Sequence, residues 1–161
     1  MSASLQYSNY SGNASFAIPY EILTAEKEIK NLYMQSCYSD LDCYEQLCNA
    51  GIGHDAAGYA TPQELRNILI ICATPYQWKH IISQRICRRN TDETRIVMLD
   101  TWQKLYDYDP ILFASKLTGP FCQKGKCKEG TMSCKHPISK EYLPLEILRA
   151  DYPLLLERRQ N

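Results

Sequence analysis

The sequence predicts an α+β protein that is mostly helical with a short sheet, and three observations support this class. Apolar residues recur at three- and four-residue steps over 24–50 and again over 91–106, which is the period of a helix buried on one face. Between these stretches lies a brief β-branched apolar run, Asn67–Thr74, which is predicted to be a buried strand. Residues 118–139 hold three Gly, two Pro and three Cys, and this composition predicts a structured loop.

Length and charge restrict the class of protein further. With 161 residues the chain is expected to form one domain over 1–161, and 45% hydrophobic residues suffice for a core. Lys plus Arg and Asp plus Glu both number 18, so no global charge points to a nucleic acid polymer or a membrane surface. The start lacks a secretory leader, and the longest apolar run, Ile68–Ala73, is too short to span a bilayer. We therefore expect a cytoplasmic protein with reduced cysteines.

The elements expected in the first half follow from caps and periodicity. Residues 1–22 are expected to be extended, and Thr24 is expected to cap a long helix that ends at Gly51. Ser39-Asp40 is a candidate break within this helix, and a short helical turn is expected at Asp55–Tyr59. The apolar positions of the long helix are Ile29, Leu32, Tyr33, Cys37, Leu41, Tyr44, Leu47 and Cys48.

Cap signals also place the helices of the second half. Thr74-Pro75 predicts a helix start, because a capping hydroxyl precedes proline at the first helical position. Asn90-Thr91 predicts a second start, and Asp109-Pro110 predicts a third, short helix. The segment Glu141–Arg159 is expected to be helical, with interruptions at its two prolines, Pro144 and Pro153.

The helix predicted after Pro75 carries a dense group of cations: Lys79, Arg85, Arg88 and Arg89. A guanidinium is a rigid planar fork of donors that fits a phosphate, a carboxylate or the imide edge of a pyrimidine. The alternative is a solvated cationic face, which is common on helices. Periodicity alone leaves both interpretations open.

Four segments in order then resemble the carboxy-terminal portion of flavin-dependent thymidylate synthases. Trp78, His80 and Arg85 match the family's W-x-H-x-x-x-x-R helix. The segment Tyr44–Pro62 is similar to Y-x-x-L-x-x-A-G-x-x-x-x-x-A-R-x-x-L-P, and Ser4–Ser11 is similar to S-x-R-Y-x-N-Y-S. The loop from Gly119 to Cys134 is similar to the family's G-P-x-C-x-x-G-x-C-x-E-G-x-M-S-C-G.

This resemblance implies a set of site residues and ligands. Arg85 would bind deoxyuridylate (dUMP) and stabilise charge that develops on the uracil ring. The nucleotide would also contact Ser4, Gln6 and Tyr7, and the cofactor FAD would lie near Thr74, His80 and Arg89. The implied co-substrates are NADPH and methylenetetrahydrofolate, and the product is dTMP. Sites in the family are built from several subunits, which implies a homo-oligomer or a hetero-oligomer.

Two departures from the family pattern concern charge. The R-H-R-x-x-S segment is absent, and Gln6 and Gly58 stand where the pattern has arginines, which leaves Arg85 as the remaining substrate arginine. Each lost charge-assisted contact costs roughly 1.5–3 kcal/mol. Losing two would weaken nucleotide binding by about a hundred- to ten-thousandfold. We therefore expect the chain to need a partner chain that supplies the R-H-R segment.

The cysteine loop has its own alternatives. Cys122, Cys127, Cys134 and His136 are soft ligands of a type that zinc accepts, but their spacing differs from the common C-x2-C pairs. The resemblance accounts for the cysteines without a metal, so we expect no zinc.

Three functional hypotheses follow. The first is a flavin-dependent thymidylate synthase-like protein that methylates dUMP reductively together with a partner chain. The alternative is a non-catalytic derivative that serves as a nucleotide-binding or regulatory subunit. A third is a free-standing zinc-stabilised interaction module.

Overall fold

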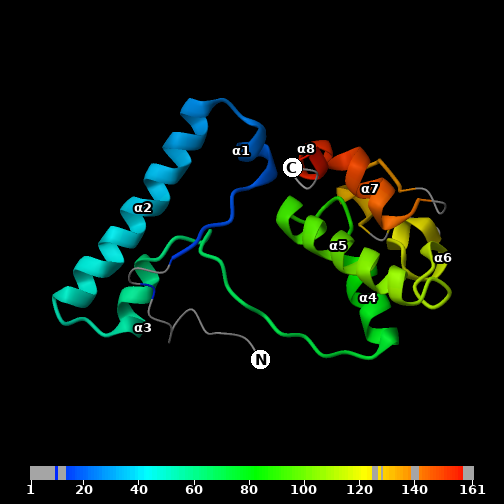
Figure 1. Cartoon of the computed structure of the whole chain (residues 1–161), viewed down its shortest axis with the longest axis horizontal. Helices are drawn as coiled ribbons and strands as arrows, with labels where there is room; N and C mark the ends of the chain where they lie inside the picture. The colour runs from blue at the N-terminus through cyan, green and yellow to red at the C-terminus, as the bar shows by residue number, and fades with distance from the viewer. Residues whose placement is uncertain (1–9, 11–13, 125–126, 128, 139–141, 158–161) are drawn as a thin grey trace. The chain divides into compact units, whose positions relative to one another are not determined.

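A computed structural model describes residues 10, 14–124, 127, 129–138 and 142–157, and the chain forms two compact units, Met1–Cys72 and Ala73–Asn161 (Figure 1). Helices dominate both units. The first unit contains α1 (Tyr20–Thr24), α2 (Lys27–Asn49), α3 (His54–Ala57) and the 3-10 turn η2 (Gly58–Ala60). Both α3 and η2 pack against α2.

The long helix α2 holds the first unit together, and it is continuous through the candidate break at Ser39-Asp40. Its end is as predicted, because Gly51 follows the helix with a φ of +86°, a left-handed conformation that favours glycine. The cap at its start is not as predicted. Glu26 precedes the first turn, while Thr24 ends α1 and donates its hydroxyl to the carbonyl of Glu21.

The predicted sheet is wrong. Among the described residues the structure shows no sheet. Phe16 and Leu65, which lie in two described segments, form an isolated antiparallel bridge. The run Asn67–Thr74 is extended but not a buried strand, since Ile68 is 76% exposed and Leu69 is 62% exposed. A β-branched run indicates a fit to a half-buried sheet surface, and this run does not have that burial.

The second unit contains five α-helices and two 3-10 turns among its described residues. They are α4 (Pro75–Arg85), α5 (Asp92–Tyr108), α6 (Ser115–Thr118), η3 (Phe121–Lys124), η4 (Gly130–Met132), α7 (Pro144–Asp151) and α8 (Pro153–Glu157). Helix α5 packs against both α4 and α7. Its Trp102 is fully buried and donates its indole N–H to the carbonyl of Phe113 at 2.9 Å. The core around Trp102 comprises Ile82, Ile86, Leu99, Ile147 and Leu148.

Two cap predictions and the break at Pro153 are confirmed, whereas the predictions at Pro144 and at Asp109-Pro110 need correction. Thr74 caps α4 in a capping box with Gln77, and Thr91 caps α5. The last helical segment is interrupted at Pro153 as predicted, since α7 ends at Asp151 and α8 begins at Pro153. Pro144 does not interrupt a helix but is the first residue of α7, where the missing N–H costs nothing. Asp109-Pro110 begins a turn instead of a helix, because the Asp109 carboxylate accepts the N–H groups of the next residues.

Among the described helices, none is both long enough and apolar enough to cross a membrane.

Candidate functional site

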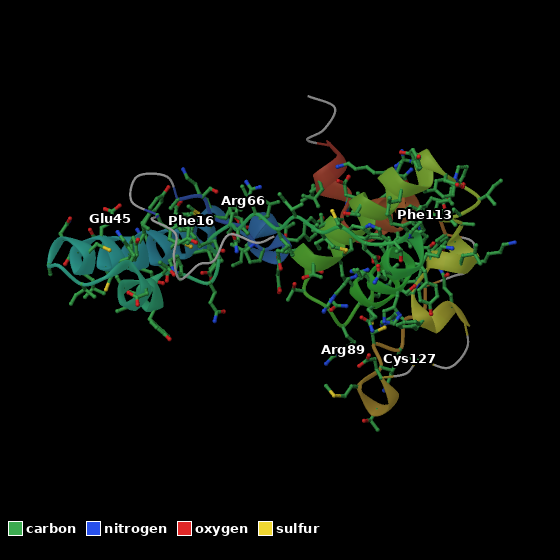
Figure 2. All side chains as sticks on the ribbon, turned by 90° about the horizontal axis from the view of Figure 1, so that it is seen from below. Phe16, Glu45, Arg66, Arg89, Phe113 and Cys127 are labelled. Atoms are coloured by element: carbon green, nitrogen blue, oxygen red, sulfur yellow. The ribbon has the colours of Figure 1, made fainter. Side chains whose placement is uncertain are left out.

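A pocket of about 650 Å³ lies within the second unit, where the end of α4 faces the cysteine loop. Its lining combines cationic side chains with thiols. Figure 2 shows Arg89 and Cys127 on the same side of this unit. Glu129 is the one carboxylate among the described lining residues, so the pocket is strongly basic. The lining residues on which its chemistry depends are His80, Arg85, Cys87, Arg88, Arg89, Cys122, Cys127, Cys134 and His136.

Helix α4 positions the first of these cations. Its start is fixed by the capping box, in which the Gln77 N–H donates to Thr74 Oγ1 and the Thr74 N–H donates to Gln77 Oε1 at 2.8 Å. Arg85 is therefore in the last turn, where a cation is favoured by the helix dipole. The Asn90 side chain donates to the carbonyl of Gln84 at 2.8 Å, which holds the chain in the turn after the helix.

A buried serine of α4 joins this helix to the chain at Thr118 and Gly119, just before the cysteine loop. Ser83 is 1% exposed, and its hydroxyl lies 2.7 Å from the carbonyl oxygen of Thr118 and 2.9 Å from that of Gly119. The neighbouring His80 meets Phe121 edge to face, with ring centroids 5.9 Å apart. These contacts set the spacing between Arg85 and the cysteine loop.

We expect Ser83→Ala to destabilise the protein by about 1–3 kcal/mol, because two buried carbonyls lose a donor. Urea unfolding followed by circular dichroism measures this loss. Ser133→Ala, which removes a half-buried hydroxyl that accepts one hydrogen bond, from the Lys135 N–H at 3.2 Å, is the matched control and should cost less than about 1 kcal/mol. Equal stability of the two variants would show that Ser83 does not hold α4 to Thr118 and Gly119.

The cysteine loop lines the pocket without assembling a metal site. Cys122, Cys127 and Cys134 are free thiols of intermediate exposure, and the Cys134 thiol donates to the carbonyl of His136 at 3.6 Å. Within the described part of the chain, no three His, Cys, Asp or Glu side chains lie close enough together to hold a metal ion.

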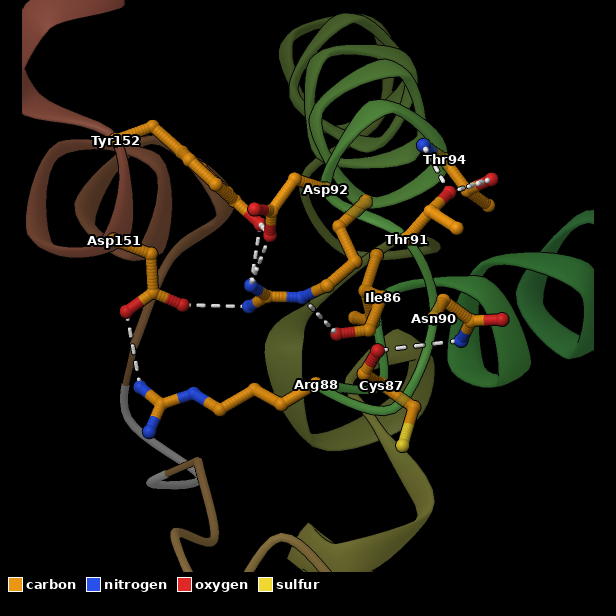
Figure 3. Close-up of polar contacts among 10 residues, drawn as sticks. Ile86, Cys87, Arg88, Asn90, Thr91, Asp92, Thr94, Asp151 and Tyr152 are labelled. Atoms are coloured by element: carbon orange, nitrogen blue, oxygen red, sulfur yellow. Dashed lines mark hydrogen bonds and ion pairs between the residues drawn. The ribbon is translucent and has the colours of Figure 1, made fainter. Parts of the chain in front are cut away.

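A buried charge network lies behind the pocket (Figure 3). Arg95 of α5 is 4% exposed; it donates to Asp151 Oδ2 of α7, to the hydroxyl of Tyr152 and to the carbonyl of Ile86. The second oxygen of Asp151 accepts from Arg88, a pocket residue, at 3.0 Å. One carboxylate thus joins a buried arginine to a pocket arginine.

Tyr152 makes this network sensitive to high pH. Burial raises the pKa of the Tyr152 hydroxyl above its ordinary value, and the hydrogen bond to Asp92 acts in the same direction. Because the folded pKa is raised, the contribution of Tyr152 to stability is complete below the unfolded value of about 10 and is lost as pH rises beyond it.

We therefore expect wild type to lose more stability between pH 9 and pH 11 than Tyr152→Phe, which has no phenol at this position. Urea midpoints measured across this range test the difference. Parallel curves for the two proteins would mean that Tyr152 does not titrate as inferred.

The predicted site residues fall into three groups. Arg85, His80, Arg89 and the four cysteine-loop residues lie together around the pocket. Thr74 lies eleven residues before Arg85 at the start of α4, and its hydroxyl is engaged with Gln77. Ser4, Gln6 and Tyr7 lie outside the described residues.

Sequence reasoning missed Asp151, Tyr152 and the burial of Arg95. Arg95 lies one residue before the apolar Ile96 and Val97, so the helical pattern predicts a cation at the edge of the buried face. In the structure Arg95 is buried and Val97 is 56% exposed, so burial at these two positions of α5 does not follow their hydropathy. The 56-residue separation of Arg95 and Asp151 leaves no local signal for their contact.

A helical unit that gathers arginines and histidines around one pocket has the chemistry of a binding domain for a small anionic ligand. The family model for thymidylate synthase complementing protein matches residues 1–111. The chain therefore belongs to this family.

Two curated relatives agree with this assignment. The flavin-dependent thymidylate synthase of Thermococcus onnurineus is 30% identical over 122 residues, and that of Geobacter sulfurreducens is 25% identical over 119 residues. Each alignment covers 73% of this chain and 49% of the relative, so the chain spans about half the length of these proteins. No solved structure gives a significant match.

Proposed function

We propose that this chain is one part of a flavin-dependent thymidylate synthase, which converts dUMP to dTMP with methylenetetrahydrofolate and acts together with a second chain. One observation carries the proposal: Arg85, His80 and Arg89, which the family resemblance selects, line the same pocket. Membership in the family and the names of the two relatives support it.

Arg85 has the chemistry required of a uracil or phosphate ligand. It is exposed at the end of α4, and its planar guanidinium presents several N–H donors to a ligand. Donors held on a fixed helix need little rearrangement as negative charge develops on a bound ring, which is how such a group lowers a barrier. His80, held against Phe121, forms an adjoining wall.

The pocket also fits the anionic part of a flavin cofactor, since His80 and Arg89 offer donors while Thr74 is committed to its helix cap. When bound, the flavin would supply the reducing electrons for the methylation. The chain's own residues would bind and orient the nucleotide.

Exposed apolar surface in the first unit supports the proposal that a second chain binds to this protein. Ile68, Leu69 and Ile70 are each more than 60% exposed in consecutive positions of an extended segment. On α2, Leu32 is 65% exposed, and of the eight predicted apolar positions only Cys37 and Tyr44 are buried. Contiguous exposed apolar residues mark surfaces that another polypeptide covers.

The runner-up is a non-catalytic nucleotide-binding or regulatory subunit. Gln6 and Gly58 favour it, because neither offers the charge that the family pattern places there. The two functions differ in one reaction: methylation at C5 of dUMP releases the hydrogen on that carbon, whereas binding alone does not.

The test uses the full chain co-expressed with a protein that carries an R-H-R-x-x-S segment. We expect the purified complex to show flavin absorbance in the visible range and to release tritium from 5-tritiated dUMP. Binding of dUMP without tritium release would favour the runner-up. A complex without flavin absorbance and without dUMP binding would contradict both.

A further inference from the structure

Arg88 is a pocket residue to which neither the resemblance nor the comparisons assign a role. It lies in the turn between α4 and α5, three residues beyond Arg85, and lines the pocket together with Arg85 and Arg89. Its side chain is 32% exposed, so a ligand in the pocket can reach it.

Asp151 holds this guanidinium by one nitrogen. The Nη2 of Arg88 lies 3.0 Å from Asp151 Oδ1, and the Asp151 side chain is 16% exposed (Figure 3). The Nε of Arg88 is shielded from solvent and has no hydrogen-bond partner among the described residues. A buried donor without an acceptor is unfavourable, but a ligand can reach only the exposed part of this guanidinium and not the shielded Nε.

The charge on Asp151 does not cancel that of Arg88. Its other oxygen accepts from Arg95, which is far more buried, with a side chain 5% exposed. The attraction between charges is stronger where water is excluded, so Asp151 interacts more strongly with Arg95 than with Arg88. Arg88 therefore keeps positive charge for the pocket while its position is fixed.

We propose that Arg88 is a second anion-binding residue of the basic pocket, that Asp151 is its positioning residue, and that Arg88 contacts the phosphate of the bound nucleotide. The identity of the anion rests on the proposed function. A guanidinium fixed at one nitrogen keeps further donors for phosphate oxygens. Such a contact would offset part of the charge missing at Gln6 and Gly58. Asp151 lies beyond residues 1–111, so the family match gives no indication of it.

The first experiment titrates dUMP and deoxyuridine into the full chain in its complex, for wild type, Arg88→Gln and Arg88→Lys. We expect Arg88→Gln to weaken dUMP binding by about ten- to a hundredfold, with deoxyuridine binding unchanged. Arg88→Lys should recover most of the loss, because it restores the charge. Equal dUMP affinity of wild type and Arg88→Gln would overturn the proposal, and so would an equal loss for deoxyuridine.

The second experiment separates this proposal from the proposed function, using inorganic phosphate as the probe. If wild type binds phosphate but not dUMP, and Arg88→Gln weakens phosphate binding about tenfold, the anion site stands while the nucleotide assignment fails. If Arg88→Gln and wild type bind phosphate equally, or neither binds it, Arg88 is not an anion ligand.

The positioning role of Asp151 has a matched control in Tyr152→Phe. Both Asp151→Asn and Tyr152→Phe weaken the contacts of Arg95, but only Asp151→Asn removes the negative charge that faces Arg88 and one of the two acceptor oxygens that Arg88 and Arg95 share. We expect both to lower the melting temperature and only Asp151→Asn to weaken dUMP binding, by about threefold or more. Equal affinities for the two variants would contradict the positioning role.

Discussion

Asp151→Ala should destabilise the protein by about 3–5 kcal/mol, because it leaves Arg95 buried without its closest carboxylate. Asp92 cannot replace that carboxylate, since it lies 3.9 Å from Arg95 and is itself 41% exposed. For a unit of this size the expected fall in melting temperature is more than about 10 °C. Thermal unfolding followed by circular dichroism measures it.

Asp107→Ala is the matched control for this change. Asp107 is a carboxylate on the exposed side of α5, and its partner there is the side chain of Gln103 at 2.7 Å. Its removal should cost less than about 1 kcal/mol, as exposed polar pairs do. If Asp151→Ala were as mild as Asp107→Ala, the Arg95 network would not hold α5 to α7.

Arg85→Ala should weaken dUMP binding by the assembled complex by about 2–5 kcal/mol, which is roughly 30- to 5,000-fold. The reason is the loss of a charge-assisted donor from the pocket in which the nucleotide is proposed to bind. Isothermal titration with dUMP measures the change, and retained helicity of the variant shows that it is folded.

Lys79→Ala is the control for charge alone. Lys79 is on the same helix as Arg85 but does not line the pocket. Its removal should change dUMP affinity by less than about threefold, because exposed charges are screened by salt. An equal loss for both variants would mean that α4 attracts dUMP by its overall charge, and unchanged affinity of Arg85→Ala would exclude Arg85 from the site.

The helices around the pocket could be predicted because their signals are local. Thr74 and Thr91 each cap the N–H groups of the next turn, so a few neighbouring residues suffice to place α4 and α5. Local signals also gave a wrong prediction at Asp109-Pro110, where they predict a helix but the Asp109 side chain stabilises a turn. They are also misleading at Asn67–Thr74, because a β-branched run indicates a strand without indicating what would pair with it.

The sequence by itself determined the starts of α4 and α5, the end of α2 at Gly51 and the family, because helix caps and motif order are read from neighbouring residues. Only the tertiary structure decided that the cysteine loop faces Arg85, that Arg95 is buried and that Asp151 holds Arg88. These contacts join residues far apart in the chain, and they exist only where packing excludes water. Packing also decided against a buried strand at Asn67–Thr74, since Ile68, Leu69 and Ile70 are exposed.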